Sequence, residues 1–316
     1  SPTKTILIIS HVKIISSCYN CLMKLQDLYK NKNTQHNGIF EWVKPVISFE
    51  IFPPDKEDPN QALCEEIKIL NRFEPAFFSL TCGAAGKNTE KSRNILTKLK
   101  ETQHLDVMPH LTCVGSSKSK ILESLDFFKK LNIENILALR GDLPENYSQS
   151  IDELYYANEL TDFIKKNSNF SIAAAGYPEG HIDCENIHQD IKNLKKKIDA
   201  GAEVIFTQMF FDNSKFFNYV HLVREEGIDV PIIPGIMPII SLLQIQKMVK
   251  LARVTLPKAL IEQLEKHQND KDYIKKLGID FASYQCQQLI DTEVKGLHFF
   301  TLNKSDSTAQ ILENIL

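Results

Sequence analysis

The sequence predicts an α/β chain that closes into a (β/α)8 barrel, the TIM barrel. Three observations support this fold class: the chain contains eight short β-rich runs, a helical pattern follows each run, and most runs are apolar throughout rather than alternating. Continuously apolar strands are typical of parallel sheets covered by helices. Eight βα units in 316 residues most simply form a barrel. A doubly wound open sheet is the alternative.

The predicted strands follow one another at intervals that leave room for a helix each time. In chain order they are "VISFE" (46–50), "AFFSLT" (76–81), "VMPHLT" (107–112), "NILALR" (135–140), "FSIAAAG" (170–176), "EVIFTQMFF" (203–211), "VPIIPG" (230–235) and "GLHFFTL" (296–302).

The predicted helical stretches lie between these runs, at residues 60–73, 88–102, 117–131, 151–167, 186–200, 213–226 and 241–293. In 190–202 the periodicity is clear, because Ile191, Leu194 and Ile198 form one apolar stripe. Gly201 then stands where a helix C-cap is favoured. The last interval is too long for one crossover helix. We therefore expect two or three extra helices between strands seven and eight, with Pro257 opening one of them.

Residues 1–45 lie outside the barrel pattern and form a predicted N-terminal extension, and residues 46–316 form one barrel domain. In the extension, "CLMKLQDLYKNKN" (21–33) predicts an amphipathic helix packed on the outside of the barrel. The opening run "TILIISHVKIISS" (5–17) is interrupted by His11 and Lys13, and no small-residue cleavage pattern follows it. It is therefore interpreted as a non-secretory segment.

Composition excludes several classes of function. The formal net charge of -3 provides no basic field for nucleic acid or anionic membranes. No apolar run approaches the roughly 18 residues of a membrane span. Seven scattered cysteines indicate free thiols in a reducing, cytoplasmic compartment. Cys18 and Cys21 form one C-x-x-C without a second pair at metal spacing, so an incidental pair is favoured over a zinc or redox site and no metal site is predicted.

Polar residues stand at the end of almost every predicted strand. In barrels of this kind the chemistry lies at the carboxyl ends of the strands. These ends carry, in order, Glu50, Thr81, His110, Arg140 with Asp142, Tyr177, Gln208, Gly235 and Asn303. The pattern predicts a polar pocket at one mouth of the barrel.

Each of these residues also has an interpretation without function. Thr81 fits a helix cap equally well, His110 fits a buried structural histidine, and Arg140 could pair only with Asp142. Glu50 is harder to explain structurally, because Phe49 and Ile51 flank it and an apolar environment favours a protonated general acid. No G-x-G, Walker A, H-E-x-x-H or G-x-S-x-G motif is present. A nucleotide cofactor would have to be held by barrel loops and helix N-termini.

Seven motifs in order resemble methylenetetrahydrofolate reductase of the short bacterial type over about residues 46–315: "SFEIFPP" (48–54), "PHLTC" (109–113), "ALRGDLP" (138–144), "YPEGH" (177–181), "TQMFFD" (207–212), "IIPGIMPI" (232–239) and "HFFTLN" (298–303). The resemblance implies a (β/α)8 barrel that binds FAD non-covalently. NADH or NADPH would reduce the flavin, and 5,10-methylenetetrahydrofolate would then accept the hydride in the same place. It also implies that no S-adenosylmethionine-binding domain follows. We further expect a homo-oligomer.

The resemblance assigns roles for catalysis and folate binding. Glu50 matches the glutamate of the "FE-x-FPP" motif and would protonate the departing nitrogen, which opens the imidazolidine ring to an iminium. Asp142 matches an aspartate beside the flavin's pyrimidine side, where a carboxylate disfavours anionic reduced flavin and stabilises the iminium. Gln208 matches a glutamine that contacts the pterin. Gln244 and Lys304 match contacts to the glutamate tail; Lys304 replaces an arginine, so it keeps the charge and loses the bidentate fork.

The resemblance also implies a set of flavin contacts, namely Thr81, His110, Arg140, Gly141, Asp142, Ala175, Tyr177, His181, Asp190, Asn193 and Lys197. The last three share one helical face. Lys197 nevertheless lies about 10 Å along the helix from Asp190, at ~1.5 Å per residue, so a helix running down the barrel wall would carry it away from the site.

Two other functions remain open from the sequence. A different flavin barrel, such as one resembling proline dehydrogenase, would also act on a C–N bond but would have no use for an acid at Glu50. A catalytically silent barrel that binds folate or flavin as a sensor is the second alternative, although all the candidate catalytic positions are filled.

Overall fold

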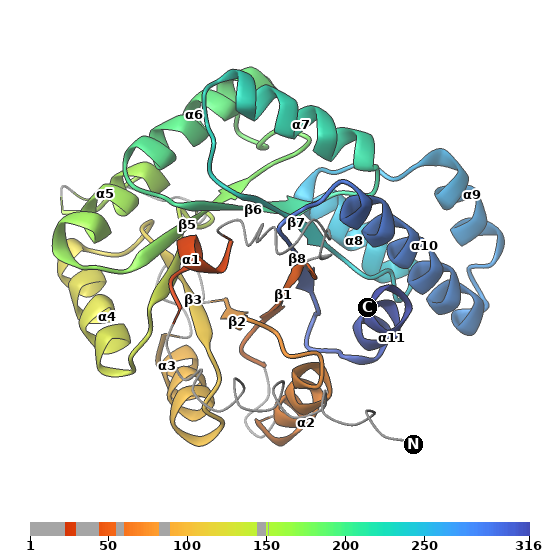
Figure 1. The fold of residues 1–316 in the computed structure, drawn as a ribbon, viewed down its shortest axis with the longest axis horizontal. Helices are drawn as coiled ribbons and strands as arrows, with labels where there is room; N and C mark the ends of the chain where they lie inside the picture. Colours follow the sequence, from red (N-terminus) through yellow and green to blue (C-terminus); the bar gives the residue numbers. More distant parts are fainter. Residues whose placement is uncertain (1–22, 30–43, 55–59, 82–88, 144–149, 151) are drawn as a thin grey trace, which may run out of the picture.

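A computed structural model describes residues 23–29, 44–54, 60–81, 89–143, 150 and 152–316. Eight parallel strands form a closed barrel in chain order (Figure 1). Closure follows because β1 pairs with both β2 and β8. The predicted barrel is confirmed, and the open-sheet alternative is wrong. The strands are β1 (Val46–Ile51), β2 (Phe77–Leu80), β3 (Val107–Thr112), β4 (Asn135–Leu139), β5 (Ser171–Gly176), β6 (Val204–Met209), β7 (Ile232–Ile236) and β8 (Gly296–Phe300).

Helices surround the barrel on its outside (Figure 1). After the first six strands they are α2 (Asn60–Asn71), α3 (Thr89–Thr97) with a π-helical turn at Lys98–Thr102, α4 (Lys118–Lys130), α5 (Ala157–Asn167), α6 (Ile187–Asp199) and α7 (Asn213–Glu225). Helix α5 begins later than the predicted residue 151. The Glu159 carboxylate accepts the backbone N–H groups of Tyr155 and Tyr156 and so starts the helix there.

Three helices lie between β7 and β8, as the length of that interval predicts. They are α8 (Leu242–Ala252), α9 (Lys258–Lys266) and α10 (Lys271–Asp291), and α11 (Asp306–Ile315) follows β8. Pro257 stands at the N-cap of α9, as predicted. These helices extend the molecule on one side (Figure 1). Their apolar faces join the ends of β6 and β7 in a separate core cluster that includes Met209, Met237, Ile245 and Leu264.

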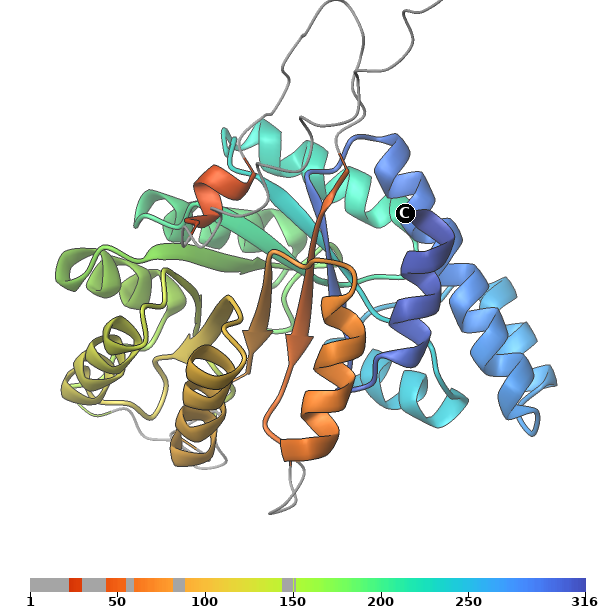
Figure 2. The same cartoon turned by 60° about the horizontal axis from the view of Figure 1, so that its bottom comes forward.

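The short helix α1 (Leu25–Leu28) lies against the end of the barrel where the strands begin, at the top in Figure 2. Leu25 and Tyr29 are buried, at 0% and 3% exposure. They pack on inward-facing strand residues that include Phe77, Met108, Leu137, Ala173, Val204, Phe206 and Ile233. The Asn135 side chain accepts the N–H of Leu25 at 3.0 Å and donates to the carbonyl of Met23 at 3.1 Å.

The expectation that this segment packs on the outside of the barrel is therefore wrong for residues 23–29. Apolar interior side chains would otherwise face water at the barrel opening, and covering them removes their apolar surface from water. Cys18, Cys21 and the apolar opening run lie outside the described residues. Within the described part of the chain, no helix combines the length and apolar character needed to cross a membrane.

Candidate active site

The carboxyl ends of the strands gather the predicted polar residues at one mouth of the barrel. Glu50 and Gln208 are the last residues but one of β1 and β6, and His110 lies within β3. Arg140 and Tyr177 follow directly after β4 and β5. Because all eight strands are parallel and closed into one barrel, these ends face the same side. The predicted convergence is confirmed for these residues.

Glu50 and His110 face each other across the inside of the barrel. Oε2 of Glu50 lies 3.6 Å from Nε2 of His110, and the two side chains are 21% and 7% exposed. Burial raises the pKa of Glu50 to about 8 and lowers the pKa of His110 to about 4. At neutral pH a protonated carboxyl therefore faces a neutral imidazole, and the contact is not an ion pair.

The His110 ring does not fit a hydrogen-bonded structural histidine. Its Nε2 is buried and has no hydrogen-bond partner among the described residues. Buried polar atoms are nearly always paired in native proteins. The Nε2 atom is covered by protein, and the Glu50 carboxyl lies beside it at 3.6 Å, slightly too far for a hydrogen bond.

A neutral polar layer lies next to this pair in the barrel interior. His298 of β8 contacts Ser48 Oγ at 2.8 Å through Nδ1 and Ser79 Oγ at 3.5 Å through Nε2. Burial, with a smaller effect of His110, lowers the pKa of His298 to about 3. The layer thus adds no positive charge that would ionise Glu50. Sequence reasoning missed these residues, although strand alternation places Ser48 on the same face as Glu50.

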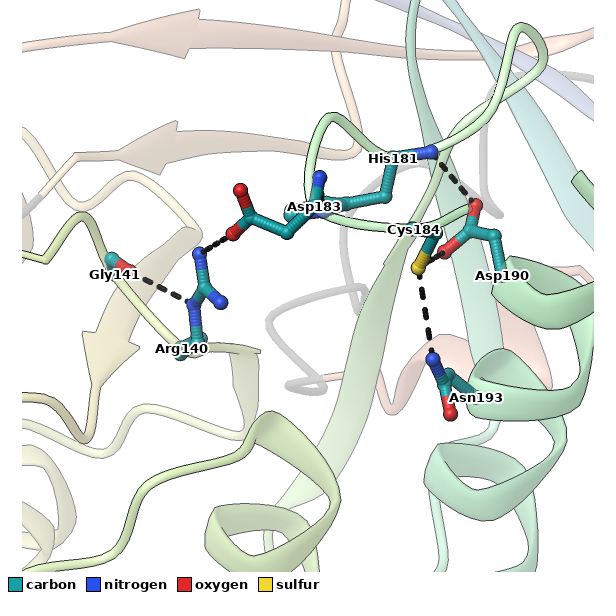
Figure 3. A network of polar contacts seen from close by, with 7 residues as sticks. All are labelled: Arg140, Gly141, His181, Asp183, Cys184, Asp190 and Asn193. Atoms are coloured by element: carbon teal, nitrogen blue, oxygen red, sulfur yellow. Dashed lines mark hydrogen bonds and ion pairs between the residues drawn. The ribbon is translucent and has the colours of Figure 1, made fainter. Parts of the chain in front are cut away.

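Arg140 lies at the rim of the mouth, where β4 ends (Figure 3). Its Nη2 donates to Asp183 Oδ2 at 2.6 Å, while Asp142 is exposed. The alternative in which Arg140 pairs only with Asp142 therefore does not hold. Gly141 has φ +85°, and a Cβ there would lie 3.1 Å from the Thr112 side chain, so this turn favours glycine. No motif pointed to Asp183.

Helix α6 contributes a second part of the rim (Figure 3). The carboxylate of Asp190 is buried, and its Oδ2 accepts the backbone N–H of His181 at 3.2 Å. Cys184 Sγ contacts Asp190 Oδ1 at 3.7 Å and accepts from Asn193 Nδ2 at 3.6 Å. Burial raises the pKa of Asp190, and the positive charge of Lys197 opposes that shift. Cys184 was not among the residues found from the sequence.

The side chain of Lys197 reaches back from the far end of α6 to the end of β5. Its Nζ donates to the carbonyl of Ala175 at 2.7 Å and lies 5.8 Å from the centre of the Tyr177 ring. The Tyr177 ring packs edge-on against His181, with centroids 4.6 Å apart. The helix does carry the Lys197 backbone away, but helical side chains tilt toward the N-terminus, and the lysine chain covers the remaining distance.

The other predicted site residues lie around the same mouth. The N–H of Thr81 donates to the carbonyl of Ile51 at 3.0 Å, and α3 begins only at Thr89. Gln208 Oε1 accepts the N–H of Met209 at 2.9 Å. Gln244, at the start of α8, accepts the N–H of Ile240 at 3.3 Å and donates to Met237 Sδ at 3.5 Å. Lys304 is exposed in the turn after β8.

Comparisons with known proteins point to one family. The family model described as methylenetetrahydrofolate reductase matches residues 36–316. The 5,10-methylenetetrahydrofolate reductase of Buchnera aphidicola subsp. Schizaphis graminum is 35% identical over 281 residues, which cover 89% of this chain and 94% of the relative. The enzyme of Escherichia coli K12 is 32% identical over 269 residues, covering 85% and 90%. Methylenetetrahydrofolate reductase (NADH) 1 of Arabidopsis thaliana is 34% identical; 93% of this chain aligns with 51% of that protein.

Among solved structures, an uncharacterized protein from Clostridium thermocellum, described as binding two copies of 5-methyl-5,6,7,8-tetrahydrofolic acid, has a TM-score of 0.59 at 13% identity. The alignment covers 86% of this chain and 95% of that protein, and it supports the fold alone. The family match spans most of the chain, and bacterial relatives align along nearly their whole length. This chain therefore belongs to the methylenetetrahydrofolate reductase family of oxidoreductases.

Proposed function

We propose that this chain reduces 5,10-methylenetetrahydrofolate to 5-methyltetrahydrofolate, using NADH or NADPH and a non-covalently bound FAD. The named reaction of its relatives supports the overall reaction. The observation that supports the mechanism is the placement of Glu50 inside the barrel mouth, 3.6 Å from His110, where burial raises the pKa of Glu50 to about 8 and lowers that of His110 to about 4. Because both substrates would bind at the same mouth in turn, the kinetic mechanism is ping-pong.

The residues of the rim fit FAD. Its phosphates need cationic donors, which Arg140 and Lys197 provide at the rim. His110, which belongs to the predicted set of flavin contacts, lies beside Glu50 at the same mouth. Further contacts come from the predicted set Thr81, Gly141, Asp142, Ala175, Tyr177, His181, Asp190 and Asn193. Bound there, FAD would supply the redox chemistry, the relay of a hydride from the pyridine nucleotide to the folate.

Glu50 supplies the proton that makes the folate reducible. The substrate's five-membered ring becomes a good hydride acceptor only when it opens to an iminium, and opening leaves a nitrogen that must be protonated. A carboxyl with pKa about 8 still carries its proton at neutral pH. His110 does not compete for this proton, because burial lowers its pKa to about 4. After the transfer, the carboxylate of Glu50 lies beside the iminium cation and stabilises it.

The remaining residues orient the folate. The carboxylate of Asp142, on the rim after β4, would stabilise the cationic iminium of the substrate and would disfavour negative charge on a flavin bound beside it. The amide of Gln208 pairs with the edge of the pterin. Gln244 at the start of α8 and the exposed Lys304 after β8 contact the glutamate tail.

A cytoplasmic location fits the free cysteines Cys64, Cys113, Cys184 and Cys286. Assembly into a homo-oligomer stays a prediction.

The decisive experiment measures the two half-reactions of Glu50→Gln separately by anaerobic stopped flow. Reduction of FAD by NADH should stay within a few-fold of wild type. Oxidation of the reduced flavin by methylenetetrahydrofolate should slow by about 10²–10⁴-fold, the usual contribution of a general acid. Glu203→Gln is the matched control: its carboxylate is partly buried just before β6, at the opposite end of the barrel. Equal slowing of both half-reactions in Glu50→Gln would contradict the role.

A further inference from the structure

The turn that follows β8 continues to hold β1 after the regular ladder between the two strands ends. The last register pair is Glu50 with Phe300. Beyond it, the backbone N–H and the Oγ1 of Thr301 both donate to the carbonyl of Glu50, at 3.4 and 2.7 Å. The main chain of the proposed acid is therefore bound twice by one residue of the neighbouring strand end.

The side chain of Asn303 then provides the next pair of hydrogen bonds to the chain after β1, in place of strand backbone. Its Oδ1 accepts the N–H of Phe52 at 3.0 Å, and its Nδ2 donates to the carbonyl of Phe52 at 2.7 Å. One side-chain amide thus presents the same acceptor and donor that a paired strand backbone would present. Because Phe52 is the second residue after Glu50, these bonds fix the chain on the outgoing side of the acid.

The backbone of this turn has an uncommon conformation. Leu302 and Asn303 have φ of 51° and 56°, in the left-handed region. Asparagine tolerates this region, whereas leucine is strained there. Such strain persists only where surrounding contacts over-determine the backbone, and it concentrates at functional sites.

The other side of the turn is hydrogen-bonded to helix α2. The N–H and Oγ of Ser305 donate to Glu66 Oε2 of α2, at 2.7 and 2.5 Å. Within the turn, the N–H of Asn303 donates to Thr301 Oγ1 at 3.2 Å, and the N–H of Lys304 donates to the carbonyl of Thr301 at 3.0 Å. The turn therefore forms one bonded unit between β1 and α2.

We propose that Asn303, together with Thr301, is a positioning residue that fixes the backbone of Glu50 so that its carboxyl points at the departing nitrogen of the folate. This inference rests on the proposed role of Glu50. Catalytic groups act only when held close to the productive geometry, and a displacement of 1 Å can reduce a rate by about 10²-fold. Among the described residues, the amide of Asn303 bonds to the backbone of Phe52, so its effect passes through the segment that carries Glu50 and not through the flavin.

The test uses Asn303→Gly and the pair Thr301→Val and Thr301→Ser. Glycine removes both amide bonds and accepts the positive φ, so it isolates the loss of the side chain. Valine keeps the shape of Thr301 without the hydroxyl, and serine keeps the hydroxyl. In Asn303→Gly and Thr301→Val, we expect the folate half-reaction at saturating folate to slow by about 10- to 100-fold. Flavin reduction by NADH and FAD affinity should stay within about twofold, and Thr301→Ser should resemble wild type.

Asn135→Gly is the matched control. The Asn135 side chain also bridges a backbone N–H and a carbonyl, at the opposite end of the barrel. Its loss should lower the melting temperature without separating the two half-reactions. Lys304→Ala distinguishes binding of the glutamate tail from positioning of Glu50, because it should raise the KM for folate with little change in the rate at saturation.

The outcomes distinguish this inference from the proposed function. If Asn303→Gly slows both half-reactions equally, or only lowers the melting temperature as Asn135→Gly does, the positioning role is wrong. If Asn303→Gly fails to fold, the Thr301→Val and Thr301→Ser pair decides, and equal rates in that pair reject the inference. If wild type does not reduce methylenetetrahydrofolate, or Glu50→Gln keeps full activity, the proposed function itself fails.

Discussion

At the scale of single residues, the behaviour of Glu50 follows from its place in β1. The side chain points into the barrel, where burial raises its pKa from 4.5 to about 8. Its neighbours are uncharged at neutral pH, because burial lowers the pKa of His110 to about 4 and that of His298 to about 3. A buried carboxyl without a cationic partner keeps its proton to higher pH than a solvated one. The arrangement thus supplies an acid at the pH where it would be used.

This environment predicts a dependence of activity on pH that belongs to one half-reaction. Because the protonated form of Glu50 is the active one, the folate half-reaction should fall as pH rises through about 8. Flavin reduction by NADH should lack this decline. Single-turnover rates of each half-reaction between pH 6 and 9.5 measure it. The decline should persist in Thr301→Ser. If flavin reduction shows the same decline near pH 8, the titrating group is not Glu50.

The same pKa shift predicts a dependence of stability on pH. Between pH 4.5 and 8 the native state binds a proton at Glu50 that the unfolded chain has released, so the stabilisation from this group falls as pH rises. From pH 6.5 to 8 the loss amounts to ~2 kcal/mol, at 1.36 kcal/mol per unit. Glu50→Gln should remove this slope. Urea unfolding of both proteins at pH 6.5 and 8 tests it, and parallel losses of stability would contradict the buried state of Glu50.

The sequence could identify Glu50 because its flanking residues are apolar, and this local signal survives in the fold. It could not identify the partners that complete the site. Asn303 bonds to Phe52 across 251 residues of chain, and Asp183 pairs with Arg140 across 43. Such pairs depend on how the strand ends meet in space. Residue patterns along one segment carry no information on them.

At the scale of elements, α6 shows how a helix outside the barrel reaches its mouth. Its first turn carries Asp190, and its last turn carries Lys197, which returns to the end of β5 by the length of its side chain. Helical spacing could predict the shared face of these residues. It could not predict the reach, because a lysine's extent depends on its rotamer and on the wall that it follows.

We predict that Lys197→Met weakens FAD binding by about tenfold or more. The substitution keeps much of the aliphatic chain and removes one charge-assisted contact, which is worth about 1.5–3 kcal/mol. Titration of the apoprotein with FAD, followed by quenching of flavin fluorescence, gives the Kd. Lys192→Met is the control, because Lys192 lies on the exposed face of the same helix. Equal affinities of the two variants would exclude Lys197 from the flavin site.

Helix α1 shows the opposite case, in which the element was expected but its place was not. Periodicity indicates that one face of such a segment is apolar, and it does not tell which surface will cover that face. Two surfaces were available, namely the outer wall and the opening at the end where the strands begin. Helix α1 covers the opening, because Phe77, Phe206 and their neighbours would otherwise face water there.

At the scale of the whole molecule, closure of the barrel is what brings the site together. The fold could be predicted because eight apolar runs with helices between them leave few topologies. Strands joined through a helix run parallel, and such crossover connections are right-handed. Strand eight ends at Phe300, before the predicted residue 302, because the chain turns left-handed at Leu302. The site therefore depends on an irregular turn that periodicity does not describe.

The last prediction concerns the stability of the whole barrel with its cofactor. The rim residues come from β4, β5 and α6, so a ligand that bridges them should stabilise the native state alone. At a free FAD concentration of 100 times Kd, binding contributes ~2.7 kcal/mol. With an unfolding entropy of ~2.1 cal/mol/K per residue for 316 residues, this raises Tm by ~4 °C. Differential scanning calorimetry of the apoprotein with and without FAD measures the shift.

Two comparisons locate the source of that shift. Riboflavin lacks the phosphates and should stabilise less than FAD at the same concentration, because it forgoes the contacts to Arg140 and Lys197. Arg140→Met should reduce the shift by FAD, whereas Arg72→Met should not, since Arg72 forms an exposed ion pair with Glu313 and lies over the Phe73 ring, away from the rim. If FAD and riboflavin stabilise the folded protein equally, the cations at the rim do not bind the phosphates, and the flavin lies elsewhere in the barrel mouth.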